Sequence, residues 1–206
     1  MFKKFSTLMF VLIMAALFTA NISEAQTTKK KAKYPGFSVT PLVGMNFPLG
    51  TLNNVYSPSW NAGIDFNLRV NRETSFFLGA GYHAFPEKND PSTGPDGSFI
   101  IINAGPRYVF TSPKIKAMMF FETGVGAYIF MLKDFTTTAT TTTPSITLPS
   151  SSTVNFGVNG GLGAIVPLGK SMDFVIKSKV HSVLGTGGSS AQTFVSGKMG
   201  LNFMFH

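Results

Sequence analysis

Histidine and serine side chains are the first candidates for chemistry in this chain of 206 residues. His83 and His181 each lie in a stretch where apolar and polar residues alternate, and Ser182 directly follows His181. Nucleophilic catalysis needs a serine within hydrogen-bond reach of a histidine base, and an acid that orients the base. Successive side chains of a strand point to opposite faces, so Ser182 and His181 do not meet. The spacing therefore predicts no catalytic residue and no enzyme.

Charged residues form the second candidate group, because they alternate with apolar residues and share one face of the predicted strands. Charges taken out of water are tolerated when they are paired. If the strands enclose an interior, we therefore expect these charges to form a salt-bridged plug that fills it. The alternative is an interior in which the charges are solvated by water. Counting along the strands places one set of charges near mid-height: Asp65, Glu122, Lys177, Lys179 and Lys198. The same count places a second set near the strand ends that the shorter connections join: Arg69, Arg107 and Asp173.

The stretch Trp60–Val70 shows which element must position these charges. Its even-numbered residues, from Trp60 to Val70, are all apolar, and the odd-numbered residues between them are small or polar. Such alternation predicts a strand with one apolar and one polar face. A soluble sandwich with the apolar face inward would show the same pattern, so the rest of the chain must decide between the two.

Seven further stretches repeat this alternation at a length that suits a tilted crossing of a membrane. With the first stretch, the predicted strands cover residues 37–47, 60–70, 74–85, 98–110, 115–131, 153–166, 171–184 and 191–206. Pro41 and Pro106 interrupt two of them, and Pro41 should lie at a bulge or kink because proline cannot donate to the ladder. We interpret glycines such as Gly79 and Gly124 as spacers that face the interior.

The connections between these strands differ in length in a regular way. Those after the first, third, fifth and seventh strands are mostly long, and those after the second, fourth and sixth are short. Transmembrane barrels have short periplasmic turns and longer outer loops. An interior lined by Asn, Lys, Arg and Glu also could not be the core of a soluble barrel. The expected fold is therefore an all-β, eight-stranded, antiparallel up-and-down transmembrane β-barrel.

The first residues have the layout of a secretory signal peptide. Lys3 and Lys4 precede an apolar run, and the small residues Ser23 and Ala25 flank Glu24. We expect cleavage after Ala25, and this run is too short for an ordinary spanning helix. Residues 26–35 then form a basic periplasmic leader, and residues 36–206 form the barrel.

Charge and cysteine content limit the alternatives further. The formal charge is +8 and there is no cysteine, which rules out a disulfide framework and acylation of a mature N-terminal cysteine. Four lysines of the leader account for much of the charge, and a solvated tail is the simplest explanation for them. No metal-ligand spacing, phosphate-binding loop or nucleic-acid motif occurs, so we expect no cofactor and no nucleic-acid partner.

The C-terminal stretch resembles the assembly signal of bacterial outer-membrane proteins. It has a glycine and two aromatic residues in alternation, Gly200, Phe203 and Phe205, although His206 places the last aromatic at the penultimate position. By this resemblance, the barrel-assembly machinery would bind Phe203 and Phe205 during biogenesis. Aromatic residues of a periplasmic girdle would look the same.

Across residues 36–206 the chain resembles the OmpA/OmpX-like family of eight-stranded outer-membrane barrels. The order of long and short connections predicts that both termini are periplasmic. We expect a monomer in the cell outer membrane, in contact with membrane lipids and lipopolysaccharide. Because this family is functionally heterogeneous, the fold does not deliver the function. We expect a structural or surface-interaction role, in adhesion or envelope integrity, with a narrow channel for small solutes or ions as the alternative. The threonine run at residues 136–143 is either an adhesive surface or a passively disordered loop.

Overall fold

The computed structural model describes residues 34–88, 95–111, 117–136, 145, 147–185 and 191–205. The predicted signal peptide and nearly all of the basic leader lie outside these residues, so both stay predictions. The same holds for His206 and for most of the threonine run, together with both interpretations of that run.

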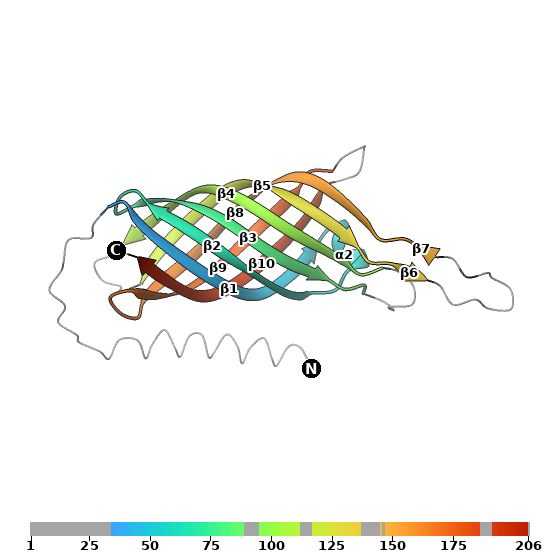
Figure 1. The fold of residues 1–206 in the computed structure, drawn as a ribbon, viewed down its shortest axis with the longest axis horizontal. Coiled ribbons are helices and arrows are strands. Elements are labelled where there is room, and N and C mark those ends of the chain that lie inside the picture. The colour runs from blue at the N-terminus through green and yellow to red at the C-terminus, as the bar shows by residue number, and fades with distance from the viewer. Residues whose placement is uncertain are drawn as a thin grey trace. The chain divides into compact units, whose positions relative to one another are not determined.

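Eight strands within the described residues close into one antiparallel barrel (Figure 1). Their order around the wall is β1, β10, β9, β8, β5, β4, β3 and β2, so each strand pairs with its neighbours in the chain and β1 closes on β10. The predicted fold class is confirmed. The wall consists of β1 (Gly36–Leu49), β2 (Ser59–Arg69), β3 (Thr74–Phe85), β4 (Gly97–Thr111), β5 (Met118–Leu132), β8 (Ser151–Pro167), β9 (Met172–Val183) and β10 (Gln192–Phe205).

Alternating burial along each strand follows the alternation in the sequence. In β2, Asp65 and Asn67 are buried inside the barrel, while Phe66 and Leu68 are exposed on its outer wall. A soluble protein would place these two faces the other way round, because apolar side chains are most stable away from water. The barrel is therefore built for an apolar surrounding.

The two ends of the barrel differ, and we name them by their connections. At the turn end, short turns join β2 to β3 and β8 to β9, and the described chain begins and ends there, with Phe37 opposite Phe205. The first of these turns is fixed by the Asn71 carboxamide, whose Oδ1 accepts hydrogen bonds from the backbone N–H groups of Glu73 at 2.9 Å and Thr74 at 2.7 Å. The opposite end, which we name the loop end, carries α2, β6 and β7 (Figure 1).

Short elements at the loop end lie where the sequence indicated only loops. The connection after β1 contains the five-residue helix α2 (Thr51–Val55), and the connection after β5 contains the paired strands β6 (Phe135–Thr136) and β7 (Thr147–Leu148). The backbone of α2 is held by its neighbours, because Lys88 N–H donates to the carbonyl of Val55 at 2.8 Å. No helix of the described chain is long and apolar enough to cross a membrane.

Pro41 lies at a gap in the β1–β10 ladder, where neither Thr40 nor Pro41 is paired, rather than at a bulge that shifts the register. The pairing register of β1 with β10 is the same on both sides of Pro41, and its register with β2 is continuous through Pro41 and Ile64. On the β10 side, Gly200 allows a close approach of the backbones, since a Cβ there would lie 1.9 Å from the carbonyl oxygen of Pro41. A proline without an N–H is therefore accommodated by a glycine on the neighbouring strand.

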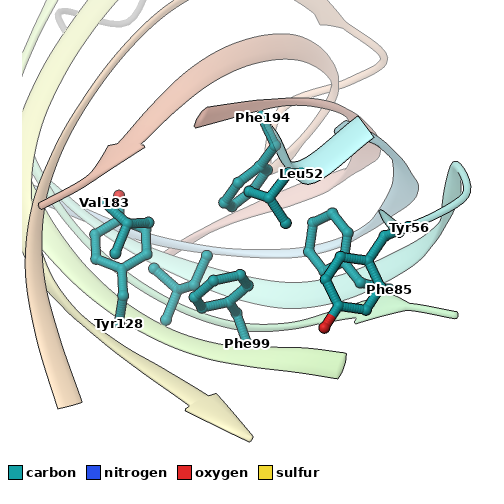
Figure 2. Packing of buried hydrophobic residues seen from close by; sticks show 8 residues of the cluster. Leu52, Tyr56, Phe85, Phe99, Tyr128, Val183 and Phe194 are labelled. Atoms are coloured by element: carbon teal, nitrogen blue, oxygen red, sulfur yellow. The ribbon is translucent and has the colours of Figure 1, made fainter. Parts of the chain in front are cut away.

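Two apolar clusters lie inside the barrel, one toward each end. The turn-end cluster consists of Val109, Phe120, Ile165 and Val175, with Met118 packed against it. The loop-end cluster, shown in Figure 2, consists of Leu52, Tyr56, Phe85, Phe99, Ile101, Tyr128, Val183 and Phe194, with Phe130 packed against it. Polar and charged side chains fill the space between the two clusters.

Candidate functional site: the filled barrel interior

Arg107 of β4 and Glu122 of β5 form the first ion pair of the interior. The two residues face each other across the β4–β5 ladder, and Arg107 Nε donates to Glu122 Oε2 at 2.7 Å. The guanidinium also donates through Nη2 to Asp65 Oδ2 of β2 at 3.1 Å. A planar guanidinium has several donors in a fixed geometry, so Arg107 can bind both carboxylates at once.

Two lysines of β9, which is separated from β5 only by β8, reach the same carboxylates. Lys177 and Lys179 are two residues apart in a strand and therefore share the inner face. Lys177 Nζ contacts Asp65 Oδ2 and lies 3.2 Å from Glu122 Oε1, and Lys179 Nζ lies 2.9 Å from the same oxygen. We name the five side chains the central charge cluster: Asp65, Arg107, Glu122, Lys177 and Lys179.

Aromatic rings support the cations of this cluster. The ammonium of Lys179 lies 3.9 Å from the ring centroid of Phe77, and the guanidinium carbon of Arg107 lies 4.4 Å from the ring centroid of Phe120. Rings attract cations through their quadrupole, and more strongly where water is excluded. Glu122 has no exposed surface at all, so its charge depends on its three cationic neighbours.

Arg107 does not lie where the sequence predicted. Its expected position was near the periplasmic end, away from Glu122, but the β4–β5 register sets the two residues side by side. Counting residues along each strand separately cannot give relative heights when strands are tilted and staggered. Lys198 also differs from expectation: it forms no ion pair with a carboxylate of the described residues, and its Nζ lies 3.2 Å from His83 Nε2.

A separate polar network lies at the turn end. Asn202 Nδ2 donates to Asp173 Oδ2 at 3.2 Å, and Asn202 Oδ1 accepts from the hydroxyl of Thr40 at 2.8 Å. Asn67 donates to that hydroxyl at 3.3 Å. Of the charges expected at this end, Asp173 is buried in this network and Arg69 is half-buried near it, with no ion pair recorded between them in the described chain.

Two buried histidines form a layer between the central charge cluster and the loop-end cluster. His83 Nδ1 lies 2.7 Å from Asn46 Oδ1, an oxygen that can only accept, so Nδ1 carries the hydrogen. Nε2 is then the acceptor for the ammonium of Lys198. This set of partners fits a neutral His83 with a defined tautomer.

His181 lies in a comparable chain of hydrogen bonds. Asn159 donates to the hydroxyl of Tyr128 at 3.3 Å, and that hydroxyl lies 3.0 Å from His181 Nδ1. The arrangement is satisfied when Tyr128 donates to Nδ1 and the Nε2–H group donates to Ser196 Oγ, 3.0 Å away. The ring also stacks on Phe194, with centroids 4.6 Å apart and planes inclined by 11°.

The pair of Ser196 and His181 was not predicted from the sequence, in which Ser182 is the serine next to His181. Ser196 lies on β10, the neighbour of β9, so an antiparallel pairing of these two strands could have suggested it. Nδ1 of His181 contacts the phenol of Tyr128 rather than a carboxylate, and both Ser196 and His181 are only 1% exposed. The geometry provides neither an orienting acid nor access for a substrate.

The loop-end cluster covers the histidine layer. Figure 2 shows Leu52 of α2 and Tyr56 together with Phe85, Phe99 and Phe194 from the barrel wall. Phe85 and Phe194 lie 5.1 Å apart in an edge-to-face arrangement, which is favourable for aromatic rings. Phe85 shares the inward face of β3 with His83, and Tyr128 shares the inward face of β5 with Glu122, as the two-residue period of a strand requires.

Inward glycines make room for these large side chains. A Cβ at Gly79 would lie 2.7 Å from Asn103 Oδ1, and one at Gly124 would lie 2.9 Å from the ring of Phe77. A Cβ at Gly161 would lie 2.6 Å from Cγ of Lys179. The interpretation of interior glycines as spacers is confirmed, because no larger residue fits without displacing the plug.

Very little empty space remains among the charges. A void of about 10 Å³ lies between the central charge cluster and the histidine layer, with Lys179, Lys198 and His83 in its lining. A void of this size holds about one water molecule. The described interior is therefore filled rather than open.

Comparisons with known proteins are consistent with this architecture. No protein-family model matches the chain, and no curated protein matches it in sequence. Among solved structures, Neisserial surface protein A (NspA) has a TM-score of 0.62 at 12% identity, over 82% of this chain and 97% of its own. OprG from Pseudomonas aeruginosa has a TM-score of 0.54 at 12% identity, over 84% and 97%. AlkL, solved in lipid bilayers, has a TM-score of 0.51 at 16% identity, over 89% and 97%.

The chain has the fold of the small outer-membrane β-barrels. The closed wall of eight antiparallel strands within the described residues and these structural neighbours agree on this point. Sequence identities this low show a shared fold but not a shared function, so the function must be argued from the residues of this chain.

The outer wall of this outer-membrane barrel fold is apolar, with aromatic residues toward both ends. At the turn end, Phe37 lies 6.3 Å from Phe66 and 6.0 Å from Phe205 between ring centroids. Toward the loop end, Trp60 and Tyr82 lie 5.3 Å apart. Girdles of aromatic residues at both interfaces are typical of transmembrane barrels.

The residues of the predicted assembly signal lie on β10 at the turn end. Phe203 and Phe205 point outward and are exposed, while Gly200 lies at the close approach to Pro41. This position fits both a girdle role and a signal that is accessible on the last strand. Binding of the assembly machinery to Phe203 and Phe205 stays a prediction.

Proposed function

We propose that this chain is a non-conducting outer-membrane β-barrel with a structural or surface-interaction role, which anchors the segments of its loop end at the cell surface. The observation that carries this proposal is the filled interior, in which the central charge cluster and the loop-end cluster close the lumen at two successive levels. An eight-stranded barrel is just wide enough for side chains to fill it.

The membrane placement is supported by the outer wall. Large apolar side chains such as Val125 and Phe156 are 67% and 73% exposed. In water, such a surface would drive aggregation, whereas lipid chains solvate it. Lipids and lipopolysaccharide are therefore the proposed contacts of the wall, with the turn end in the periplasm.

The surface role is assigned to the loop end because the elements beyond the wall gather there. The helix α2 is tied to the connection after β3 by Lys88, whose Nζ donates to the carbonyl of Asn53 at 2.9 Å. The β6–β7 hairpin is held by the Ser150 backbone N–H, which donates to Asp134 Oδ1 at 2.5 Å. These contacts give the described elements of the loop end an ordered shape that a partner could bind.

Conductance in planar lipid bilayers tests the closed interior. We expect the refolded wild-type barrel to give no stepwise current, with its insertion verified by co-flotation with vesicles of the same lipid. Current steps from inserted wild-type protein would contradict the proposal and favour the narrow-channel alternative.

Deletion and complementation in the source bacterium test the role itself. Loss of the protein should raise envelope permeability to a large dye or reduce adhesion. A chain that lacks residues 135–150 should restore permeability in full, because it keeps the barrel, but should not restore adhesion. A deletion strain that is unchanged in both measurements would contradict both roles.

A further inference from the structure

The described interior around the central charge cluster carries more positive than negative charge. Arg107, Lys177 and Lys179 share the carboxylates of Asp65 and Glu122. Lys198 adds a fourth cation close by, and it is not ion-paired with a carboxylate of the described chain. Four cationic side chains therefore face two carboxylates in a part of the barrel where unpaired charge is unfavourable.

The ammonium of Lys198 has more donors than its contact with His83 uses. It has three N–H groups, and the recorded partner is Nε2 of His83 at 3.2 Å. Gly81 keeps this corner open, because a Cβ there would lie 3.3 Å from Lys198 Nζ and 3.5 Å from His83 Nε2. A larger residue at Gly81 would occupy the space next to the ammonium.

The void of about 10 Å³ lies where these cations converge. Lys177, Lys179 and Lys198 all contribute to its lining, together with His83 and His181. A space of this size accepts one water molecule or one ion of similar size, and is too small for a sulfate, a phosphate or an organic anion. Its surroundings favour negative charge, because three lysines outnumber the one carboxylate in the lining, Asp65.

We propose that the void beside Lys198 is a binding site for one small monovalent anion of the halide class. The anion accepts hydrogen bonds from the ammonium of Lys198 and offsets part of the excess positive charge of the interior. It acts as a structural counter-ion that is part of the plug. This inference depends on the interior alone and is independent of any role at the cell surface.

Anomalous diffraction from crystals of the refolded wild-type barrel in sodium bromide tests the site directly. We expect an anomalous peak in the void, in contact with Lys198 Nζ. A map without a peak in the void would overturn the proposal and leave a neutral Lys198 beside a water molecule as the explanation.

Thermal unfolding in detergent gives a second test in solution. Bromide should raise the Tm relative to gluconate at equal ionic strength, by about 5 °C or more at a bromide concentration a hundred times the Kd. Lys198→Met should abolish this difference, whereas Lys170→Met, on the exposed β8–β9 turn, should preserve it. Equal responses of the wild type to bromide and gluconate would overturn the proposal, and this result does not depend on whether Lys198→Met folds.

Discussion

The central charge cluster and the loop-end cluster close the same barrel by different physics. In the central charge cluster, Asp65 and Glu122 are each bound by at least two cations from two different strands, β4 and β9, so every member depends on the others. In the loop-end cluster, rings such as Phe85 and Phe194 are held by packing, and contact energy is spread over many atom pairs. Single substitutions in the central charge cluster should therefore lower the free energy of unfolding more than single substitutions in the loop-end cluster.

Removal of Glu122 should be the most damaging single change. Glu122→Ala leaves Arg107, Lys177 and Lys179 with one carboxylate between them, and loss of one partner of a buried ion pair costs about 4 kcal/mol in the free energy of unfolding. Urea titration in detergent, followed by the fluorescence of Trp60, measures this loss. Lys177→Ala should also destabilise the barrel.

The matched control is Glu73→Ala, because Glu73 lies on the exposed β2–β3 turn. This change should alter the free energy of unfolding by less than about 0.5 kcal/mol. If Glu122→Ala and Lys177→Ala both unfold like the wild type, the interior charges are solvated and the salt-bridged plug is wrong.

Truncation of Phe194 should cost somewhat less. Its ring is fully buried and stacks on His181, and removal of a buried phenylalanine side chain costs about 3 kcal/mol. Phe156→Ala is the control, since Phe156 is an outward phenylalanine of β8 that touches lipid or detergent rather than the plug. Equal losses for the two variants in the same urea titration would show that the loop-end cluster contributes nothing specific.

Double-mutant cycles should separate the two clusters by their internal coupling. Glu122→Ala and Lys179→Ala should be coupled by about 2 kcal/mol, because their side chains are 2.9 Å apart and share one ion-pair network. Glu122→Ala and Val183→Ala, taken from the two different clusters, should be additive to within about 0.5 kcal/mol. Strong coupling in the second cycle would mean that the two levels of the plug form one cooperative unit.

The sequence predicted the inward or outward direction of these side chains better than their heights. Direction follows from the two-residue period of a strand, so Asp65, Glu122 and Lys177 were assigned to the interior from alternation alone. Height depends on stagger between strands, which no single stretch encodes, and this is why Arg107 was misplaced. The contrast between short turns and long connections was enough to predict the topology.

Two features could not be predicted from the sequence because tertiary contacts create them. Helix α2 has five residues, too few to be stable alone, and its Leu52 is ordered by insertion into the loop-end cluster. The contact of His181 with Ser196 joins residues on neighbouring strands rather than neighbours in the sequence. Counting partners across the predicted β9–β10 pairing would have been the available signal.

Tyr56→Phe should give the smallest effect on stability, and this effect should appear only at high pH. It concerns the loop-end cluster, to which Tyr56 belongs. Burial, together with the negative charges of Glu87 and Asp96, raises the pKa of the Tyr56 phenol above its ordinary value of 10.0. Because the pKa of this phenol is higher in the folded than in the unfolded protein, its contribution to the free energy of unfolding is complete below a pH of about 10. That contribution is lost as the pH rises through the pKa of the folded state. The stabilities of the wild type and Tyr56→Phe should therefore differ only above a pH of about 10, where the wild type should be the first to lose hydrogen-exchange protection in α2.

The comparison is controlled for the other tyrosines. They are present in both proteins, so their ionisation cancels in the difference. An identical pH profile for the two proteins would mean that the phenol of Tyr56 is exposed to water and is not buried in the loop-end cluster.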